Sequence, residues 1–257
     1  MDLQLKGRTA LVTGGSRGIG FGVAQGLAAE GCNVHIASRN AADLEAARGR
    51  ITAAHPVKVT CHPLDLSVAE NTVKLARDCG DLDILINNAG AIPQGSITDF
   101  DDKSWRSAWE LKMFGYINLT REVYRRMSER KRGVIINVIG GAGERPTAGY
   151  VAGSIANAGL MTLSRALGAE SPKFGVRVLG LNPSATATDR GIERWKKQAQ
   201  NDLGDAEKWQ DLTKGFPFGR PATVEEVANV VVFLASDRAS YVTGTVVSVD
   251  GGAAWRK

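Results

Sequence analysis

Residues 13–20 read Thr-Gly-Gly-Ser-Arg-Gly-Ile-Gly and follow directly on a short apolar run, Thr9–Thr13. Glycines at this spacing permit a tight turn and a close approach of the backbone to a bound group. The residues after the run have helical character, and the first turn of a helix presents free N–H groups that attract an anion. A strand, a glycine-rich turn and a helix in this order predict a cradle for the pyrophosphate of a dinucleotide.

The rest of the chain alternates short apolar or β-branched runs with longer amphipathic stretches, which is typical of repeated βαβ units. We therefore expect an α/β fold of the Rossmann-like, doubly wound type, with helices on both faces of a seven-stranded parallel sheet. No repeat or linker divides the sequence, so residues 1–257 are expected to form a single dinucleotide-binding domain. The expected strands are Thr9–Thr13, Asn33–Ser38, Val57–Cys61, Ile84–Asn87, Gly133–Val138, Val176–Leu181 and Val246–Val249.

Two of the expected helices carry capping signals at their first turns. Ser67 is expected to cap the helix over Val68–Cys79. Thr223 and Glu226 have the spacing of a capping box, in which each side chain bonds to the backbone N–H of the other residue.

One long segment, Ala185–Pro221, breaks the alternation of strands and helices. It is polar and rich in Lys, Arg and Trp, and long excursions beyond a strand end commonly cover a substrate. We expect a substrate loop or lid at about residues 185–221. The segment carries four basic side chains, those of Arg190, Arg194, Lys196 and Lys197. These side chains either contact an acidic or phosphate-bearing substrate or form a solvated face of a helix.

The composition is that of an ordinary globular protein, with 43% hydrophobic and 23% charged residues and a formal net charge of +5. Because both charge signs are interspersed along most of the chain, we expect no nucleic-acid binding and only a mild preference for anionic small molecules. No apolar run approaches the roughly 20 residues that cross a bilayer, and no signal peptide is apparent, so a cytoplasmic location without membrane contact is expected.

The cysteines and histidines show no ligand spacing in the sequence. The three cysteines are odd in number and widely separated, which predicts no disulfide framework, and the three histidines match no metal motif. We therefore expect no metal site. These residues are Cys32, Cys61, Cys79, His35, His55 and His62.

Several motifs resemble those of the short-chain dehydrogenase/reductase family. Residues 13–20 resemble its TGxxxGxG signature, and residues 87–90 resemble its NNAG motif. Asp65 stands where the family contacts adenine, and Thr243-Gly244 with residues 249–252 resemble the characteristic ending. The resemblance spans nearly the whole chain, and it implies a nicotinamide dinucleotide, a small-molecule substrate and a homo-oligomer, a tetramer or a dimer.

The resemblance also indicates which nucleotide is bound. Ser38-Arg39 ends the second expected strand, where an acidic residue would favour NAD(H). Arg39 and Arg17 instead offer charge-assisted hydrogen bonds to a 2′-phosphate, so NADP(H) is preferred and NAD(H) remains the alternative. The predicted cofactor-binding residues are Gly14, Ser16, Arg17, Gly18, Ile19, Gly20, Ser38, Arg39, Asp65, Leu66, Asn88, Ala89, Gly90, Asn157, Pro183, Thr186 and Thr188.

The chain departs from the family at the catalytic residues, which are normally an Asn, a Ser, a Tyr and a Lys. Alignment from neighbouring residues places Lys112 at the Asn position, Gly140 at the Ser position, Gly153 at the Tyr position and Asn157 at the Lys position. The chain is therefore expected to be an atypical member that lacks the catalytic tetrad. Glycine is costly inside a helix, so Gly153 indicates that a ligand or a close backbone needs space there.

Three hypotheses about function follow from this replacement. The first is an NADP(H)-dependent oxidoreductase in which Lys112, its pKa lowered by burial, or Tyr150 at a helix N-terminus serves as acid and base. The second is a lyase-, isomerase- or hydrolase-like enzyme that retains the nucleotide and uses Lys112 as a base or imine-forming amine. The third is a non-catalytic nucleotide-binding sensor or scaffold subunit.

Overall fold

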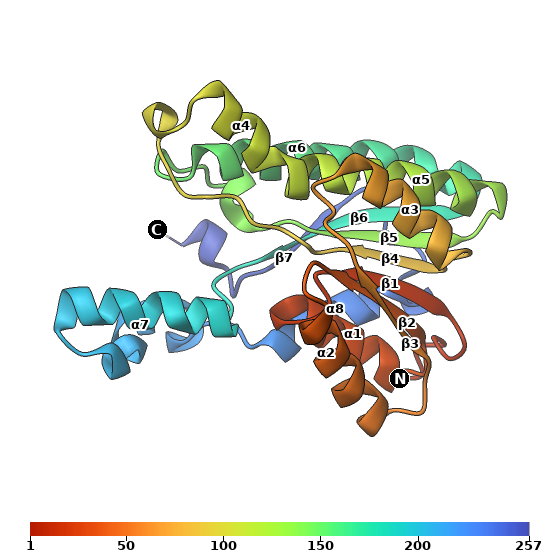
Figure 1. The fold of residues 1–257 in the computed structure, drawn as a ribbon, viewed down its shortest axis with the longest axis horizontal. Coiled ribbons are helices and arrows are strands. Elements are labelled where there is room, and N and C mark those ends of the chain that lie inside the picture. Colours follow the sequence, from red (N-terminus) through yellow and green to blue (C-terminus); the bar gives the residue numbers. More distant parts are fainter. Residues whose placement is uncertain (257) are drawn as a thin grey trace.

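The computed structural model describes residues 1–256 and places seven parallel strands in one sheet between two layers of helices (Figure 1). Across the sheet the strands lie in the order β3-β2-β1-β4-β5-β6-β7, so the winding direction reverses between β1 and β4. This is the doubly wound α/β fold that the alternating sequence pattern predicts. The strands are β1 (Thr9–Thr13), β2 (Asn33–Ser38), β3 (Val59–Pro63), β4 (Ile84–Asn87), β5 (Gly133–Val138), β6 (Val176–Pro183) and β7 (Val246–Val249).

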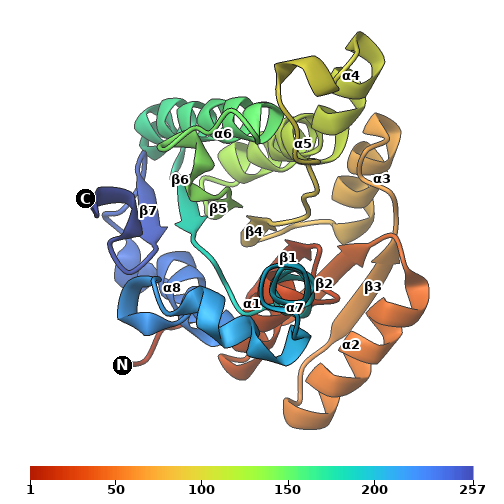
Figure 2. The same ribbon diagram turned by 90° about the vertical axis from the view of Figure 1, so that its left-hand side faces the viewer.

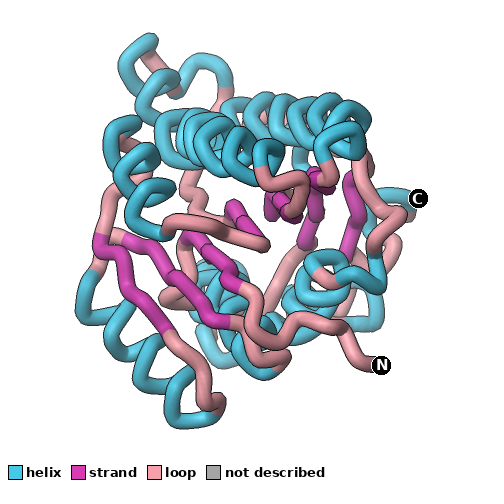
Figure 3. Tube along the Cα trace, turned by 90° about the vertical axis from the view of Figure 1, so that its right-hand side faces the viewer, coloured by secondary structure: helices cyan, strands magenta, loops and turns pink. Residues whose placement is uncertain are grey.

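Helices cover both faces of the sheet (Figure 3). One layer holds α1, α2 and α8, and the opposite layer holds α3, α5 and α6, with α4 at one end (Figure 1). Within residues 1–256, none of these helices is long and apolar enough to cross a bilayer. The helices are α1 (Gly18–Ala29), α2 (Ala41–Ala54), α3 (Ala69–Cys79), α4 (Asp102–Trp109), α5 (Gly115–Glu129), α6 (Val151–Glu170), α7 (Asp189–Leu203) and α8 (Val224–Ala235).

The central strands are apolar on both faces because both faces are covered. Along β1, Ala10 and Val12 belong to the core beneath α1 and α8, whereas Leu11 belongs to the core beneath α3 and α5. Side chains alternate between the two faces of a strand, so a continuous apolar run fills both cores. This explains why the strands of this chain read as unbroken runs of Val, Ile, Leu and Ala.

Three sequence-based expectations about element boundaries need correction. Strand β3 begins at Val59 and not at Val57, because its ladder with β2 first pairs Val59 with Val34. Strand β6 extends to Pro183, where it still pairs with β7. Ser67 does not cap α3: the cap residue is Val68, without a side-chain bond, and the Ser67 hydroxyl donates to the Asp65 carboxylate. The capping box of Thr223 and Glu226 is confirmed.

The segment from residue 185 to 221 folds largely as helix and projects beyond the carboxyl ends of the strands (Figures 1 and 2). Its main element is α7, which packs against a 3-10 stretch, Ala206–Thr213. The buried Trp195 ring stacks on Trp209 at a centroid distance of 5.7 Å and meets Phe216 edge-on at 5.9 Å. These aromatic contacts give the segment an apolar core of its own.

Candidate active site

The loops that follow β1 and β4 are held together by the side chain of Thr13. Its hydroxyl accepts the backbone N–H groups of Asn88 at 2.9 Å and Ala89 at 3.0 Å. The Asn88 amide donates in return to the Thr13 carbonyl at 3.0 Å. Both loops lie at the point where the strand order reverses, which is where doubly wound sheets bind their ligands.

Two glycines of the run are required by close contacts. Gly14 has φ +65°, and a Cβ there would lie 2.9 Å from the Asn88 amide nitrogen. At Gly20, a Cβ would overlap the Gly14 carbonyl. Helix α1 then begins at Gly18 without a side-chain cap, so its first N–H groups stay free for an anion. A backbone cradle with an uncapped helix start fits the pyrophosphate of a dinucleotide.

The residues predicted to meet the adenosine end lie beside this cradle. The Ser16 hydroxyl donates to the Ser38 hydroxyl at 3.2 Å, and Asp65 accepts the backbone N–H of Ser67 at 3.0 Å. Arg17 forms an ion pair with Asp43 of α2, which places it at the mouth of the cradle but engages it with a carboxylate. Arg39 is exposed and forms no ion pair within residues 1–256.

A cleft of about 470 Å³ runs from the glycine loop toward the carboxyl ends of β5 and β6, and a cavity of about 920 Å³ adjoins it. Lys112, Thr188 and Arg190 line both spaces. Leu66 is buried in the core, which leaves only its backbone to contact a ligand. The predicted cofactor residues that line the cleft or the cavity are Gly14, Arg17, Gly18, Ile19, Asn88, Ala89, Gly90, Asn157, Pro183, Thr186 and Thr188.

Lys112 lies in a π-helical turn, Glu110–Phe114, that joins α4 to α5. Such turns are rare and are found preferentially at functional sites. The Lys112 ammonium donates to the Ile139 carbonyl, at the end of β5, and pairs with no carboxylate in the described chain. Burial lowers the pKa of Lys112 to about 8, and the neighbouring Arg190 adds to the effect. The expected lowering of this pKa is therefore present.

Tyr150, the cap residue of α6, occupies the space above Gly153. A Cβ on Gly153 would lie well under 3.0 Å from three atoms of the Tyr150 ring. The ring packs against the buried apolar cluster of Ile92, Ala108, Ala152 and Ala156, and it lines the large cavity. The space expected at Gly153 is therefore taken by an aromatic ring from one turn earlier, and not by backbone or by an open pocket.

Asn157 and Gly140 contact each other in the wall of the large cavity. The Asn157 amide donates to the Gly140 carbonyl at 3.2 Å, while its buried carbonyl oxygen has no partner among the described residues. Gly140 has φ +120°, a conformation that favours glycine. A buried acceptor without a partner is costly, and this oxygen is closed off from solvent, so only a rotation of the side chain would bring it to a bound hydroxyl or water.

Helix α7 supplies a basic wall to the cavity. Arg190, Arg194 and Lys197 line it together with one acidic residue, Glu193. Lys196 does not belong to this wall, because its ammonium pairs with Glu207 at 2.6 Å. Of the four basic candidates in the sequence, three therefore face the same cavity as Lys112 and Tyr150.

Two arrangements escaped the sequence analysis. The fit of the Tyr150 ring over Gly153 had one signal in the sequence, a glycine inside a helix, but the signal does not name the group that fills the space. The second arrangement is a cluster of His35, His62 and Cys79, whose ligand atoms lie within 4.8 Å of one another. Nothing in the spacing of these residues predicts it.

The reversed strand order, the glycine cradle and the adjoining cavity define a dinucleotide-binding α/β protein. The sequence profile of the family described as Enoyl-(Acyl carrier protein) reductase matches residues 14–254. The chain belongs to the short-chain dehydrogenase/reductase family, a family of nicotinamide-dependent oxidoreductases.

Individual relatives match over almost their whole length. The chain is 33% identical to 3-oxoacyl-[acyl-carrier-protein] reductase FabG of Chlamydia muridarum, over 99% of this chain and 100% of that protein. It is also 33% identical to NADPH-dependent reductase BacG of Bacillus subtilis, over 95% and 97%. The solved structure of L-sorbose reductase from Gluconobacter frateurii with NADPH and L-sorbose superimposes with a TM-score of 0.93, at 31% identity and full coverage of both chains.

Proposed function

We propose that this chain is an NADP(H)-dependent oxidoreductase that reduces a carbonyl group, with Tyr150 as the proton donor. In this proposal the family's catalytic Asn, Ser, Tyr and Lys are replaced by Lys112, Gly140, Gly153 and Asn157. The family membership supports redox chemistry. Two relatives support the nucleotide, since BacG is named NADPH-dependent and L-sorbose reductase was solved with NADPH.

One observation carries the assignment of Tyr150. Its ring fills the volume above Gly153 and lines the same cavity as Lys112 and Asn157. A phenol ring thus lies at the Cβ position of the residue aligned with the family's tyrosine, although it comes from a residue one turn earlier. Within residues 1–256 the Tyr150 hydroxyl has no hydrogen-bond partner, which leaves it free for a substrate oxygen.

The residues around the cavity have complementary roles in this proposal. When bound, the nicotinamide supplies the hydride. Tyr150 donates a proton to the substrate oxygen, and the positive charge of Lys112 stabilises the negative charge that develops there. The Asn157 amide holds the Gly140 carbonyl and so positions this part of the cavity wall beside the bound nucleotide or substrate. α7 covers the cavity and brings its basic side chains to the substrate.

The charges of the cavity favour an anionic substrate. Lys112, Arg190, Arg194 and Lys197 line it, and only Glu193 opposes them. Cations gathered around a partly desolvated space repel one another, and a carboxylate or phosphate on the ligand would offset this repulsion. We therefore infer a ketone or aldehyde that carries a carboxylate or phosphate group.

The test is a panel of carbonyl compounds in matched pairs, each acid beside its amide or ester. NADPH oxidation is followed by the absorbance of the reduced nicotinamide, with NADH in parallel. We expect turnover with NADPH and a kcat/KM at least about tenfold higher for the acid, since one partly desolvated charge pair contributes more than about 1.4 kcal/mol. Binding of NADPH without any turnover would reject the reductase and favour a nucleotide sensor.

A second candidate function is a non-redox reaction through an imine on Lys112. The lowered pKa of Lys112, about 8, leaves part of the amine neutral near neutral pH, as a nucleophile requires. Borohydride reduction in the presence of the keto acids of the panel tests this candidate. An adduct on Lys112 would support it, and unmodified protein by mass spectrometry would exclude it.

A further inference from the structure

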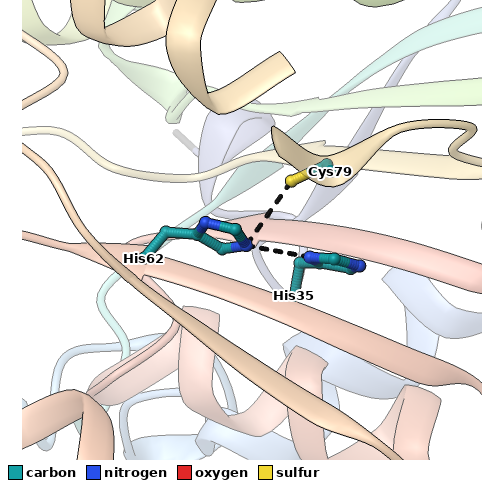
Figure 4. A group of neighbouring side chains, drawn as sticks. All are labelled: His35, His62 and Cys79. Atoms are coloured by element: carbon teal, nitrogen blue, oxygen red, sulfur yellow. Dashed lines mark hydrogen bonds between the residues drawn. The ribbon is translucent and has the colours of Figure 1, made fainter. Parts of the chain in front are cut away.

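Nitrogen and sulfur donors gather on the sheet at its β3 edge, outside the cavity and the cleft of the candidate active site. His35 lies on β2, His62 lies on the edge strand β3, and Cys79 is the last residue of α3 (Figure 4). One ligand atom from each residue lies within 4.8 Å of the other two. None of these residues lines the spaces around the glycine loop and Lys112.

Two contacts converge on one nitrogen of His62 (Figure 4). Its Nε2 lies 2.8 Å from His35 Nδ1 and 3.7 Å from Cys79 Sγ. An imidazole nitrogen carries either one proton or one lone pair, so it satisfies only one of these partners at a time. His62 and Cys79 are 8% and 7% exposed, and His35 alone of the three residues is partly exposed to solvent.

We propose that His35, His62 and Cys79 bind a zinc-class divalent cation. Two imidazole nitrogens and one thiolate are the donor types that zinc prefers, and three protein ligands leave a fourth position for water or another small ligand. A cation at the centre of the cluster bonds to all three groups at once. It thereby removes the competition for the single nitrogen of His62.

Two of the three ligand–ligand distances lie close to those of a zinc site, and the third, between His35 and Cys79, is within 4.8 Å and must close to about 3.6 Å. Zinc bonds of about 2.0–2.1 Å to nitrogen and about 2.3 Å to sulfur place tetrahedral N and S ligands about 3.6 Å apart, and two N ligands about 3.3 Å apart. The 3.7 Å between His62 Nε2 and Cys79 Sγ already matches. The two histidine nitrogens, 2.8 Å apart, must separate by about 0.5 Å, which rotation of the side chains provides.

The two histidines are suited to bind a metal, because burial favours their neutral form. Burial lowers the pKa of His35 to about 4, with His62 and Lys58 adding to the effect, so its ring is neutral near pH 7. Burial also lowers the pKa of His62. Burial raises the pKa of the Cys79 thiol to about 12, which opposes its ionisation, so the cation must displace the thiol proton to solvent as the metal–sulfur bond forms. Asp78, paired with Lys74, contributes a neighbouring negative charge.

The site would join three separate elements at the open edge of the sheet. A cation held by β2, β3 and α3 binds the folded chain and requires all three elements in place. It therefore stabilises the fold by mass action and raises the temperature of unfolding. This role is independent of the reaction proposed for the cavity.

The test is a titration of the full-length chain, stripped with a chelator, with cobalt(II) and then with zinc(II) against a chromophoric chelator. We expect one equivalent of cobalt to give visible bands of a tetrahedral site together with sulfur-to-cobalt charge transfer. Cys79→Ser and His62→Gln should weaken zinc binding by more than about 100-fold, beyond the 10–100-fold that loss of a supporting group typically costs. Cys61→Ser and His55→Gln are matched controls, because neither residue belongs to the cluster.

The proposal is overturned if the wild-type chain binds no stoichiometric zinc, or if Cys79→Ser binds it as tightly as the wild type. Zinc should raise the melting temperature of the wild type and of both controls, but not that of Cys79→Ser. If the cluster variants fail to fold, the test uses the Cys32→Ser/Cys61→Ser double variant, in which Cys79 is the one remaining thiol. Sulfur-to-cobalt charge transfer in that chain assigns the thiolate to Cys79, and its absence rejects the site.

Discussion

The Tyr150 ring lies where the side chain of residue 153 would begin, so Tyr150 and Gly153 are structurally interdependent. The tyrosine caps α6 and the glycine lies in its first turn. Only a residue without a Cβ leaves room for this ring. The glycine at residue 153 is therefore required for the position of the Tyr150 ring in the cavity.

Gly153→Ala is expected to destabilise the fold, although alanine is the better helix former. In an open helical site this exchange gains about 1 kcal/mol, whereas overpacking costs about 1–3 kcal/mol. Gly49→Ala is the matched control, because Gly49 also lies in a helix and a Cβ there meets nothing within 4 Å. In urea unfolding, the free energy of unfolding should be lower for Gly153→Ala and higher for Gly49→Ala than for the wild type. A gain at both would contradict the packing of Tyr150.

Tyr150→Phe is expected to lower kcat by about 10²–10⁴-fold while the fold is retained, because it removes a proton donor but no hydrogen bond within the described chain. The measurement is kcat and KM on the best substrate of the carbonyl panel. Tyr124→Phe serves as the control, since Tyr124 packs against Phe174 away from the cavity. An undiminished kcat in Tyr150→Phe would transfer the proton-donor role to another group.

The fold and the nucleotide cradle could be predicted because they depend on local sequence. The alternation of apolar strands with amphipathic helices and the glycine run of residues 13–20 are each contained in one short stretch. Strand β3 was placed two residues early because its start depends on its register with β2, in which Val59 pairs with Val34. Register between separate strands is a tertiary property.

The details of the site depended on such tertiary contacts. The sequence predicts Lys112 and Asn157 in the site, but the position of the Tyr150 ring over Gly153 involves packing against a buried cluster that includes Ile92 and Ala108, which are distant in sequence. The grouping of His35, His62 and Cys79 likewise requires the β2–β3 register and the position where α3 ends. Side chains from distant segments meet through packing, which no spacing in the sequence records.

Gly140→Ser is expected to destabilise the chain without improving activity, although it restores the residue type usual in the family. Gly140 has φ +120°, and a Cβ there would press on the Asn157 amide at 3.3 Å. A non-glycine residue in such a conformation costs about 1–3 kcal/mol. Gly141→Ser provides the comparison in stability, because nothing lies within 4 Å of its added Cβ. Higher turnover in Gly140→Ser would show that the family's serine can still act here.

Arg39→Ala is expected to weaken NADPH binding by about 10- to 100-fold and to leave NADH binding unchanged, since charged hydrogen bonds contribute about 1.5–3 kcal/mol. Arg39 follows the end of β2 and has no ion-pair partner in the described chain, whereas Arg17 already pairs with Asp43. Fluorescence titration with both nucleotides gives the affinities. Arg48→Ala is the control, because Arg48 pairs with Glu45 on the exposed face of α2. Equal losses for both nucleotides would refute recognition of the 2′-phosphate.

The charge on Lys112 is expected to set the alkaline limit of activity. Burial lowers the pKa of Lys112 from 10.5 to about 8, so the ammonium is present below that pH and is lost above it. With an anionic substrate, kcat/KM should be constant below about pH 8 and fall about tenfold per pH unit above it. Tyr150 does not account for this fall, because burial raises the pKa of its phenol. Lys112→Met should have a low kcat/KM that does not fall above about pH 8. If the fall above pH 8 remains in this variant, another group causes it.

The same shift predicts a change of stability with pH, whose sign follows from proton binding. Between about pH 8 and 10.5 the unfolded chain holds a proton on Lys112 that the folded chain has released. The unfolding free energy contributed by this group therefore rises with pH across the window and is lost as pH falls through about 8. The measurement is the free energy of urea unfolding of the wild type and of Lys112→Met at about pH 8 and at about pH 10.5. Subtracting the two proteins cancels the contributions of all other titrating groups. The wild type should gain stability relative to Lys112→Met as pH rises, and a constant difference would mean that Lys112 titrates alike in both states.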